Sequence, residues 1–288
     1  MIVKFEPSLD GYQLLIWLLF YASALWTHII GDRIFWRFNL VIGGISFLIV
    51  LFFCFGSLAY VDWKFNTLGD SYLAFVDDLS GFIKVLPIAV WFFVGVEALP
   101  LSSDDTEKPK SVIPVAQVAC VVSLFVTGTM MLFITVTLPC PGGIKAIAAN
   151  LAPVNNGFVK LAHLSEQIAT MLFISATYAT VFGFIWCYGK VIQAMATSKL
   201  LPPMPANVSP RYGTPHIVLI AGSILGYAIY LIVYLNSHIG KYLYSICIIS
   251  AFVSYSGQCV GYIVLKNYKN VKSSYFKSPF RISEPFIP

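Results

Sequence analysis

Seven long apolar segments, separated by short polar stretches, dominate the hydropathy pattern of this chain. Each is long enough to cross the roughly 30 Å hydrocarbon core of a bilayer as an α-helix, at about 1.5 Å per residue. The segments cover residues 12–30, 38–60, 82–102, 112–138, 165–189, 214–235 and 241–265. The pattern predicts an all-α membrane protein with seven transmembrane helices. No linker divides the chain, so we expect a single transmembrane domain over residues 1–288.

The polar stretches between the segments predict the connections. A short turn, RIFWR, is expected at residues 33–37, and a loop containing Pro, Gly and Asn at 139–163. The acidic and lysine-bearing stretch DDTEKPK follows the third segment at 104–110, and the turn NSHIG occupies 236–240. These short connections favour a bundle of spans that alternate in direction.

Composition supports a membrane location and excludes several classes of function. Of the 288 residues, 58% are hydrophobic and 11% are charged, with a mean hydropathy of +0.80, whereas about a quarter of a soluble domain is charged. The net charge of +5 forms no basic patch interleaved with aromatics, so nucleic acid is not an expected partner. Scattered His and Cys give no metal-ligand spacing. We expect no cofactor, no metal and no enzymatic activity, because no nucleophile–base pairing emerges.

The basic residues predict an orientation. In an alternating seven-span topology, twelve of the 18 Lys and Arg lie on one side and six on the other. The six are Lys4, Lys64, Lys84, Lys145, Lys160 and Lys241. Because cytoplasmic loops carry the excess of Lys and Arg, the N-terminus is expected outside and the C-terminus in the cytosol.

One carboxylate, Glu97, lies within the third apolar segment, in an apolar run that extends back to Phe82. A charged side chain at the bilayer centre costs about 2.5–3.5 kcal/mol on insertion scales, so such residues usually face a cavity and act there. We expect Glu97 to line a solvated path and to exchange a proton. The alternative is a structural carboxylate that hydrogen-bonds across helices or stays hydrated near the interface.

Gly95 and Pro100 flank this carboxylate and predict a broken helix near residues 94–100. Glycine weakens a helix, while proline lacks a backbone N–H and crowds the carbonyl of Val96. Irregular backbone is tolerated at membrane depth only where it lines a cavity or is buried in protein. Unpaired carbonyls near residues 94–96, including that of Val94, are therefore expected to accept from a substrate ammonium group.

The aromatic run before the break contributes the other predicted binding residues of this segment. Trp91 lies six residues before Glu97 and is followed by Phe92. Aromatic runs in membrane helices usually pack against lipid or other helices. Beside a helix break, however, a Trp face can stack over a cationic amine and close the site. The predicted substrate site on this segment thus comprises Trp91, Phe92, Val94, Gly95 and Glu97.

The fifth segment adds Ser175, in a hydroxyl-rich run that includes Thr177 and Tyr178. Small hydroxyl residues mostly serve close helix packing, so Ser175 is a packing residue or, alternatively, a substrate ligand. Lys190, at the predicted end of this segment, is most simply an interfacial anchor.

The acidic stretch at residues 104–110 is either a simple solvated connector or a gate. Asp104 and Asp105 lie in a solvated connector, and their carboxylates can also pair with a cytosolic lysine such as Lys190 as a gate. We therefore group Glu97 with these three residues as the predicted coupling and gating set.

The stretch from Trp91 to Pro114 resembles the sixth helix and following loop of the amino acid–polyamine–organocation (APC) transporters. The family pattern is an aromatic run, Gly-x-Glu, two acids, then Pro, a basic residue and a second Pro. The matching residues here are Trp91, Gly95, Glu97, Asp104, Asp105, Pro109, Lys110 and Pro114.

A second stretch, CYGKVIQAMATSKLLPPMP followed by PRYGTPH, looks like the end of the eighth helix of that family, with Lys190 in place of the usual Arg. The tail YFKSPFR resembles the loop after the tenth helix. Within the superfamily, the strings WFFVGVEALPL and YGK…LLPP are most similar to ethanolamine permeases.

This resemblance implies that the chain corresponds to helices four to ten of a twelve-helix fold built from two inverted five-helix repeats. A start at helix four agrees with the predicted external N-terminus. Nothing matches the family's first helix, which completes the substrate site. The lysine sometimes found in the family's fifth helix is absent from residues 38–60, which leaves Glu97 as the obvious protonatable group.

The resemblance implies a secondary active transporter of amino acids or small amines such as ethanolamine, in the lipid bilayer of the plasma membrane. Transport would proceed by alternating access around a midplane site on the third span, with a proton as coupling ion. Two alternatives stay open. One is a truncated, non-transporting or regulatory fragment of such a permease; the other is a seven-helix receptor, which would leave the Trp91–Pro114 pattern unexplained.

Overall fold

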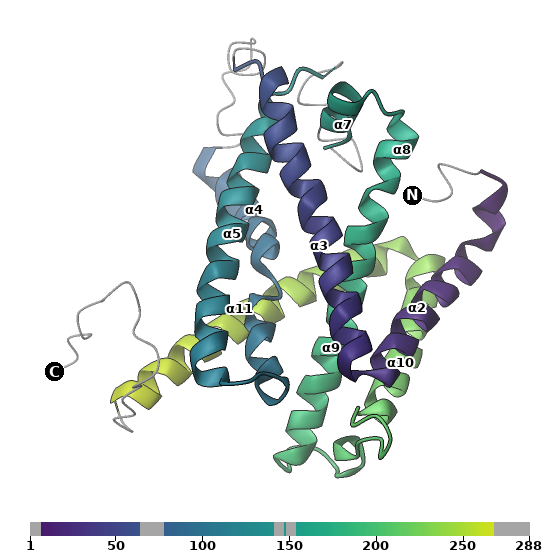
Figure 1. The fold of residues 1–288 in the computed structure, drawn as a ribbon, viewed down its shortest axis with the longest axis vertical. Coiled ribbons are helices and arrows are strands. Elements are labelled where there is room, and N and C mark those ends of the chain that lie inside the picture. Colours follow the sequence, from purple (N-terminus) through teal and green to yellow (C-terminus); the bar gives the residue numbers. More distant parts are fainter. Residues whose placement is uncertain (1–6, 64–77, 141–146, 148–153, 268–288) are drawn as a thin grey trace. The chain divides into compact units, whose positions relative to one another are not determined.

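The computed structural model describes residues 7–63, 78–140, 147 and 154–267. Within that part of the chain, helices follow one another without a strand (Figure 1). The α-helices are α2 (Gln13–Ile30), α3 (Asp32–Ser57), α4 (Asp78–Val90), α5 (Pro109–Thr137), α7 (Asn155–Ala162), α8 (Glu166–Met171), α9 (Phe173–Thr197), α10 (His216–Leu235) and α11 (Ser237–Asn267). Short 3-10 helices are η1 (Pro7–Tyr12), η2 (Leu58–Tyr60), η3 (Trp91–Phe93), η4 (Val96–Asp105) and η5 (Met204–Ala206).

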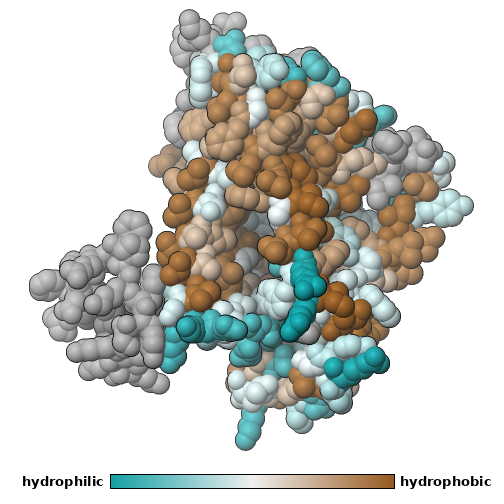
Figure 2. Space-filling model, viewed as in Figure 1, coloured by the Kyte–Doolittle hydropathy of each residue, from teal (hydrophilic) through white to brown (hydrophobic). Residues whose placement is uncertain are grey.

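Within the described residues, seven helical segments are long and apolar enough to cross a membrane. They are Gln13–Ile30, Arg33–Tyr60, Leu79–Asp105, Pro109–Thr137, Glu166–Thr197, His216–Leu235 and His238–Val264. The all-α class and the seven predicted spans are therefore confirmed, and the protein is a multi-pass membrane protein. Large apolar side chains of α3 such as Leu40 and Leu48 are 75% and 64% exposed, as lipid-facing residues are. Figure 2 shows hydrophobic residues along α3, with hydrophilic ones near its N-terminal end.

Several predicted boundaries differ from the structure. The expected turn at 33–37 is helical, because α3 already begins at Asp32 and Gly31 alone makes the turn, with φ +60°. Phe35, within that stretch, is 6% exposed and packs in the core, which favours the helix. Likewise α11 begins at Ser237, inside the expected turn at 236–240. Hydropathy marked the apolar runs correctly, but the helices extend into polar residues at their ends.

The fifth span also differs from its predicted form. It begins where expected, with the Ser165 side chain accepting from the Ile168 N–H at 3.3 Å, but Leu172 separates α8 from α9. α9 then continues to Thr197, so Lys190 lies inside a helix and not at its end. The position of Lys190 no longer identifies it as an end-of-helix anchor.

The chain divides into two compact units. The first comprises Met1–Asp78 and Phe125–Ile239, and the second comprises Leu79–Leu124 and Gly240–Pro288. Both buried hydrophobic clusters found among the described residues belong to the first unit. The single-domain interpretation of the whole chain remains a prediction.

In the first unit, one cluster joins α2, the start of α3, α9 and α10, which lie together in Figure 1. Ala24, Phe35, Phe182, Ile185 and Leu219 form its buried centre. A polar contact crosses the same cluster: the His28 ring, 3% exposed, has Nε2 2.9 Å from the Phe182 carbonyl oxygen. This packing fixes the ends of α2, α3 and α10 relative to one another.

The second cluster of the first unit holds α7 in place. Phe53 and Cys54 of α3, Ile134 of α5, Phe158 of α7 and Ala169 of α8 are its main buried residues. α7 falls inside the stretch predicted as a loop, 139–163, of which residues 141–146 and 148–153 lie outside the described residues. Asn155 ties α7 to the fifth span, its Nδ2 donating to Thr170 Oγ1 at 2.7 Å. Tertiary packing, which hydropathy does not report, thus stabilises this short helix.

Candidate substrate site

The third span is broken near its middle, within the second unit. α4 ends at Val90, η3 covers Trp91–Phe93, a turn occupies Val94 and Gly95, and η4 continues to Asp105. Gly95 has φ +107° and ψ −19°, a conformation that residues with a Cβ rarely adopt. The break predicted near residues 94–100 is therefore confirmed, and it is centred on Gly95.

Both sides of the break use tight, three-residue hydrogen bonds. The Val94 N–H donates to the Trp91 carbonyl at 3.1 Å, and the Ala98 N–H donates to the Gly95 carbonyl at 3.0 Å. η4 spans ten residues, whereas 3-10 runs longer than three or four residues are uncommon. Pro100 lies within η4 and not at the break itself. Gly95 thus makes the turn, while Pro100 keeps the following segment from returning to regular α-helix.

The Glu97 carboxylate folds back over this turn. Its Oε2 accepts a hydrogen bond from the Gly95 N–H at 2.9 Å. The side chain is neither buried nor fully exposed, and it forms no ion pair within the described part of the chain. The carboxylate therefore satisfies a backbone donor that the broken helix leaves without an intrahelical acceptor.

Tyr255 of α11 meets the same carboxylate, and sequence analysis did not single it out. Its hydroxyl lies 3.1 Å from Glu97 Oε2 and 3.2 Å from the carbonyl oxygen of Phe93. A phenol has one proton to donate, so the two acceptors share it. Tyr255 belongs to the second unit with the break, and it ties both sides of the break to α11.

A glutamine of α5 also reaches the break. Gln117 Nε2 donates to the Val96 carbonyl at 3.4 Å, a long and therefore weak contact. The structure here differs from the expectation of unpaired carbonyls near 94–96, since the Gly95 and Val96 oxygens both have donors. Among the hydrogen bonds of the described residues, none ends on the Val94 carbonyl oxygen, which leaves it open to a ligand.

Two aromatic residues before the break, Trp91 and Phe92, differ in their surroundings: Trp91 packs against α11, whereas Phe92 is exposed. The Trp91 ring lies 4.9 Å from that of Tyr244, on α11 of the same unit, with the ring planes inclined by 53°. Phe92 is 42% exposed, and its ring meets the edge of the neighbouring Phe93 ring at 5.8 Å. Trp91 therefore packs against α11 within the second unit.

The remaining predicted residues lie elsewhere. Asp104 and Asp105 end η4 and are exposed, at the far end of the segment from Gly95. Ser175 and Lys190 are on α9, in the first unit. The Ser175 hydroxyl donates to the Leu172 carbonyl at 3.0 Å, within its own span, as expected of a packing hydroxyl. Within the second unit, the structure thus brings together Trp91, Val94, Gly95 and Glu97, and adds Tyr255 and Gln117.

No group of three or more His, Cys, Asp or Glu is placed to hold a metal ion in the part of the chain that the structure describes. The chemistry of the site rests on one carboxylate, one phenol and backbone carbonyls. Carboxylate and carbonyl oxygens accept hydrogen bonds, so such a set suits a ligand that donates them.

Comparison with known proteins agrees with this geometry. A search of curated proteins finds none that matches the chain. The family model described as Amino acid permease matches residues 14–284, which is nearly all of it. That span includes all seven candidate membrane helices except the first residue of α2. The chain therefore belongs to the amino acid permease family, whose members are transporters of amino acids or related substrates and not enzymes.

Proposed function

We propose that this protein is a secondary active transporter that binds a small amino acid or amine, such as ethanolamine, at the broken third span. The observation that carries the proposal is the arrangement at Gly95. There a carboxylate within the third candidate membrane span accepts hydrogen bonds from the Gly95 N–H and the Tyr255 hydroxyl. The family supports an amino acid or related substrate, and the resemblance of residues 91–101 to ethanolamine permeases supports the amine.

The substrate's ammonium group would bind between Glu97 and the open carbonyl of Val94. Glu97 has no cationic partner among the described residues, and a charge in the membrane is normally neutralised by a partner. An ammonium group offers three donors and no acceptor, which suits a carboxylate and a carbonyl. Trp91, with Phe92, would cover the bound cation through its ring face.

Proton exchange at Glu97 would couple transport to a proton gradient. The ionised carboxylate accepts from two donors at a single oxygen, and charge-assisted bonds of this kind are the strong ones. Protonation removes that charge and weakens both bonds. The Tyr255 hydroxyl can then donate to the Phe93 carbonyl alone, which lies only 0.1 Å further away (3.2 against 3.1 Å). Proton binding would thereby release η4 from α11.

Movement of one helix bundle against another would then expose the site alternately to the two sides. In this proposal the N-terminus is outside and the C-terminus is in the cytosol, in the plasma membrane, and residues 1–288 act as one permease domain. Asp104 and Asp105, which are exposed at the end of η4, would act as gating residues on the cytosolic side, as would Lys190.

Uptake measurements test the proposal. Cells or proteoliposomes carrying the protein are supplied with labelled ethanolamine or labelled amino acids, at several external pH values. We expect uptake to depend on external pH, because the ammonium group and the proton both engage the Glu97 carboxylate. Glu97→Gln, which keeps the shape and removes the exchangeable proton, should lower uptake about tenfold or more and abolish its pH dependence. Unchanged uptake and pH dependence in Glu97→Gln would contradict the assignment. Glu107→Gln, at an exposed carboxylate outside the predicted binding and gating residues, serves as the matched control.

A further inference from the structure

A single amide side chain, Gln117, lies within the apolar part of α5 in the second unit. Among residues 111–137, no other side chain carries an amide or a charge. Gln117 is eight residues from Pro109, the first residue of α5, which is about 12 Å along the helix axis. A polar group at such a position in a candidate membrane span costs free energy unless it has hydrogen-bond partners, and such groups commonly serve function.

The Gln117 amide has hydrogen-bonding capacity that the described residues leave unused. Its Nε2 donates to the Val96 carbonyl oxygen at 3.4 Å, and no other hydrogen bond joins the side chain to the described part of the chain. Because a carbonyl only accepts, the amide presents its nitrogen to Val96, which leaves Oε1 and the second N–H for another partner. The side chain is neither buried nor fully exposed. The amide can therefore both accept from and donate to a ligand.

Gln117 and Glu97 engage the same short piece of backbone. The Glu97 carboxylate accepts from the Gly95 N–H at 2.9 Å, and the Gln117 amide donates to the carbonyl of the next residue, Val96. The carbonyl of Val94, which the proposed ammonium group would use, lies two residues before that of Val96. The Cα atoms of these two residues are at most about 7 Å apart. A neutral amide thus lies beside the proposed ammonium site.

The charges around the break restrict the second polar group of the substrate. The side chains that hydrogen-bond at residues 93–97 are those of Glu97, Tyr255 and Gln117, and among the described residues none of them is a cation. A substrate carboxylate would meet the like charge of Glu97. A hydroxyl is neutral and, like an amide, both donates and accepts. The site therefore suits an amine that carries a hydroxyl group.

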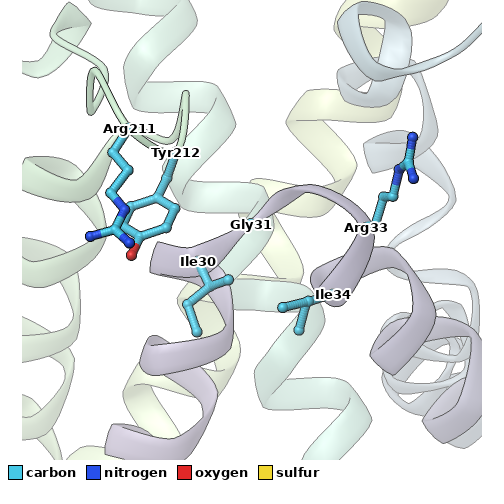
Figure 3. Close-up of a pocket in the computed structure, with 6 residues that line it drawn as sticks. All are labelled: Ile30, Gly31, Arg33, Ile34, Arg211 and Tyr212. Carbon is cyan, nitrogen blue, oxygen red and sulfur yellow. The ribbon is translucent and has the colours of Figure 1, made fainter.

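The pocket at the α2–α3 turn of the first unit lacks a comparable convergence of polar groups. Its volume is about 290 Å³, and Arg33 and Arg211 are among the residues that line it. In Figure 3, the Arg33 side chain points away from Arg211, on the opposite side of the turn at Gly31. The two guanidinium groups therefore do not meet at a single ligand, in contrast to the groups at the break.

We propose that Gln117 is a specificity-determining residue, whose amide hydrogen-bonds the hydroxyl of a short amino alcohol while the ammonium group binds Glu97 and the Val94 carbonyl. This role rests on the proposed function, which it narrows from amines in general to amines with a hydroxyl two carbons from the nitrogen. With a hydrogen bond of about 3 Å at each end, such a molecule is long enough to join residues 94 and 96.

Uptake of three labelled substrates that differ at one end tests the role of Gln117. Ethanolamine carries the hydroxyl, propylamine has a methyl group in its place, and glycine has a carboxylate in place of the alcohol group. We expect the wild-type kcat/KM for ethanolamine to exceed that for propylamine and for glycine about tenfold or more. Propylamine would leave the amide unpaired, and glycine would bring a second negative charge. Equal uptake of glycine and ethanolamine would overturn the hydroxyl as the recognised group.

Gln117→Leu should lower kcat/KM for ethanolamine about tenfold and leave that for propylamine within about twofold, so that the preference disappears. Gln117→Asn, which keeps an amide, should give a ratio between those of wild type and Gln117→Leu, and it carries the test if Gln117→Leu does not fold. The matched control Gln167→Leu, at an exposed position of α8 in the first unit, should keep the full ratio. A merely structural role for Gln117 would lower uptake of both amines equally, and that unchanged ratio would overturn the proposal.

Glu97→Gln, measured with the same substrates, separates an error in the role of Gln117 from an error in the transport site. If Glu97→Gln loses uptake of both amines while Gln117→Leu keeps the wild-type ratio, the role of Gln117 is wrong and the transport site stands. If Glu97→Gln transports as wild type does, or if wild type takes up none of the three substrates, the transport site is wrong and the role of Gln117 falls with it.

Discussion

The hydroxyl of Tyr255 lies 3.1 Å from Oε2 of Glu97, across 158 residues of sequence. The same hydroxyl is 3.2 Å from the Phe93 carbonyl, so a single side chain of α11 contacts the polypeptide before and after Gly95. Since Glu97 also accepts from the Gly95 N–H, the carboxylate is the common partner of the turn and of α11. A change in the charge of Glu97 therefore alters its hydrogen bonds to both the turn and α11.

Removing only the phenolic oxygen of Tyr255 tests whether its hydrogen bond to Glu97 contributes to transport. We expect Tyr255→Phe to lower the uptake kcat/KM about tenfold, because a hydrogen bond to a charged group contributes about 1.5–3 kcal/mol. The matched control is Tyr244→Phe, on the same helix, where the ring contact with Trp91 is kept. Uptake by Tyr255→Phe that equals uptake by Tyr244→Phe would remove Tyr255 from the mechanism.

Gly95→Ala should destabilise the protein through its backbone conformation and not through a collision. No atom lies within 4 Å of the position that a Cβ would take, but φ at Gly95 is +107°. The strain of a left-handed conformation in a residue with a Cβ costs roughly 1–2 kcal/mol. In detergent, the variant should unfold at a lower temperature than wild type.

Gly257→Ala is the control for that prediction. Gly257 lies within α11, where a Cβ would likewise have no atom within 4 Å and where φ is not positive. Alanine there should be neutral or slightly stabilising, because it is the better helix former. If the two variants had equal unfolding temperatures, the turn at Gly95 would not be a fixed feature of the fold.

Gly157→Ala should loosen the docking of α7. A Cβ at Gly157 would collide with the Phe53 ring and would lie 2.7 Å from Ser57 Oγ. Phe53 is 1% exposed and has no room to move, and overpacking of this kind costs about 1–3 kcal/mol. We expect faster hydrogen exchange across Asn155–Ala162 in this variant. Gly183→Ala, where no atom lies within 4 Å, should exchange like wild type.

Much of the fold followed from hydropathy alone, because lipid demands long apolar helices. The seven spans, the break in the third span and the start of the fifth span to within one residue were all predictable from local composition. The ends of the helices were harder to predict. Arg33 and Arg37 suggested a turn, yet α3 begins before both, since long basic side chains can reach the headgroups from within a helix.

The candidate site was only half predictable. Gly95 and Glu97 are close neighbours in sequence, and their residue types indicate both the break and the charge within the membrane. Tyr255 gave a weaker signal, a hydroxyl between two serines in an apolar segment, and nothing in the chain links it to Glu97. The pairing arises from tertiary packing between α11 and the broken span, which local sequence does not encode.

Thiol accessibility at the break tests most directly the claim that this turn faces water and substrate. In a background without the six native cysteines, Val94→Cys is treated with a membrane-impermeant thiol reagent, and Val85→Cys, at an exposed apolar position of α4, is the comparison. We expect rapid labelling at residue 94, slowed severalfold by saturating substrate, and little labelling at residue 85. A thiol at residue 94 that reacts no faster than one at residue 85, with or without substrate, would show that the turn does not face water.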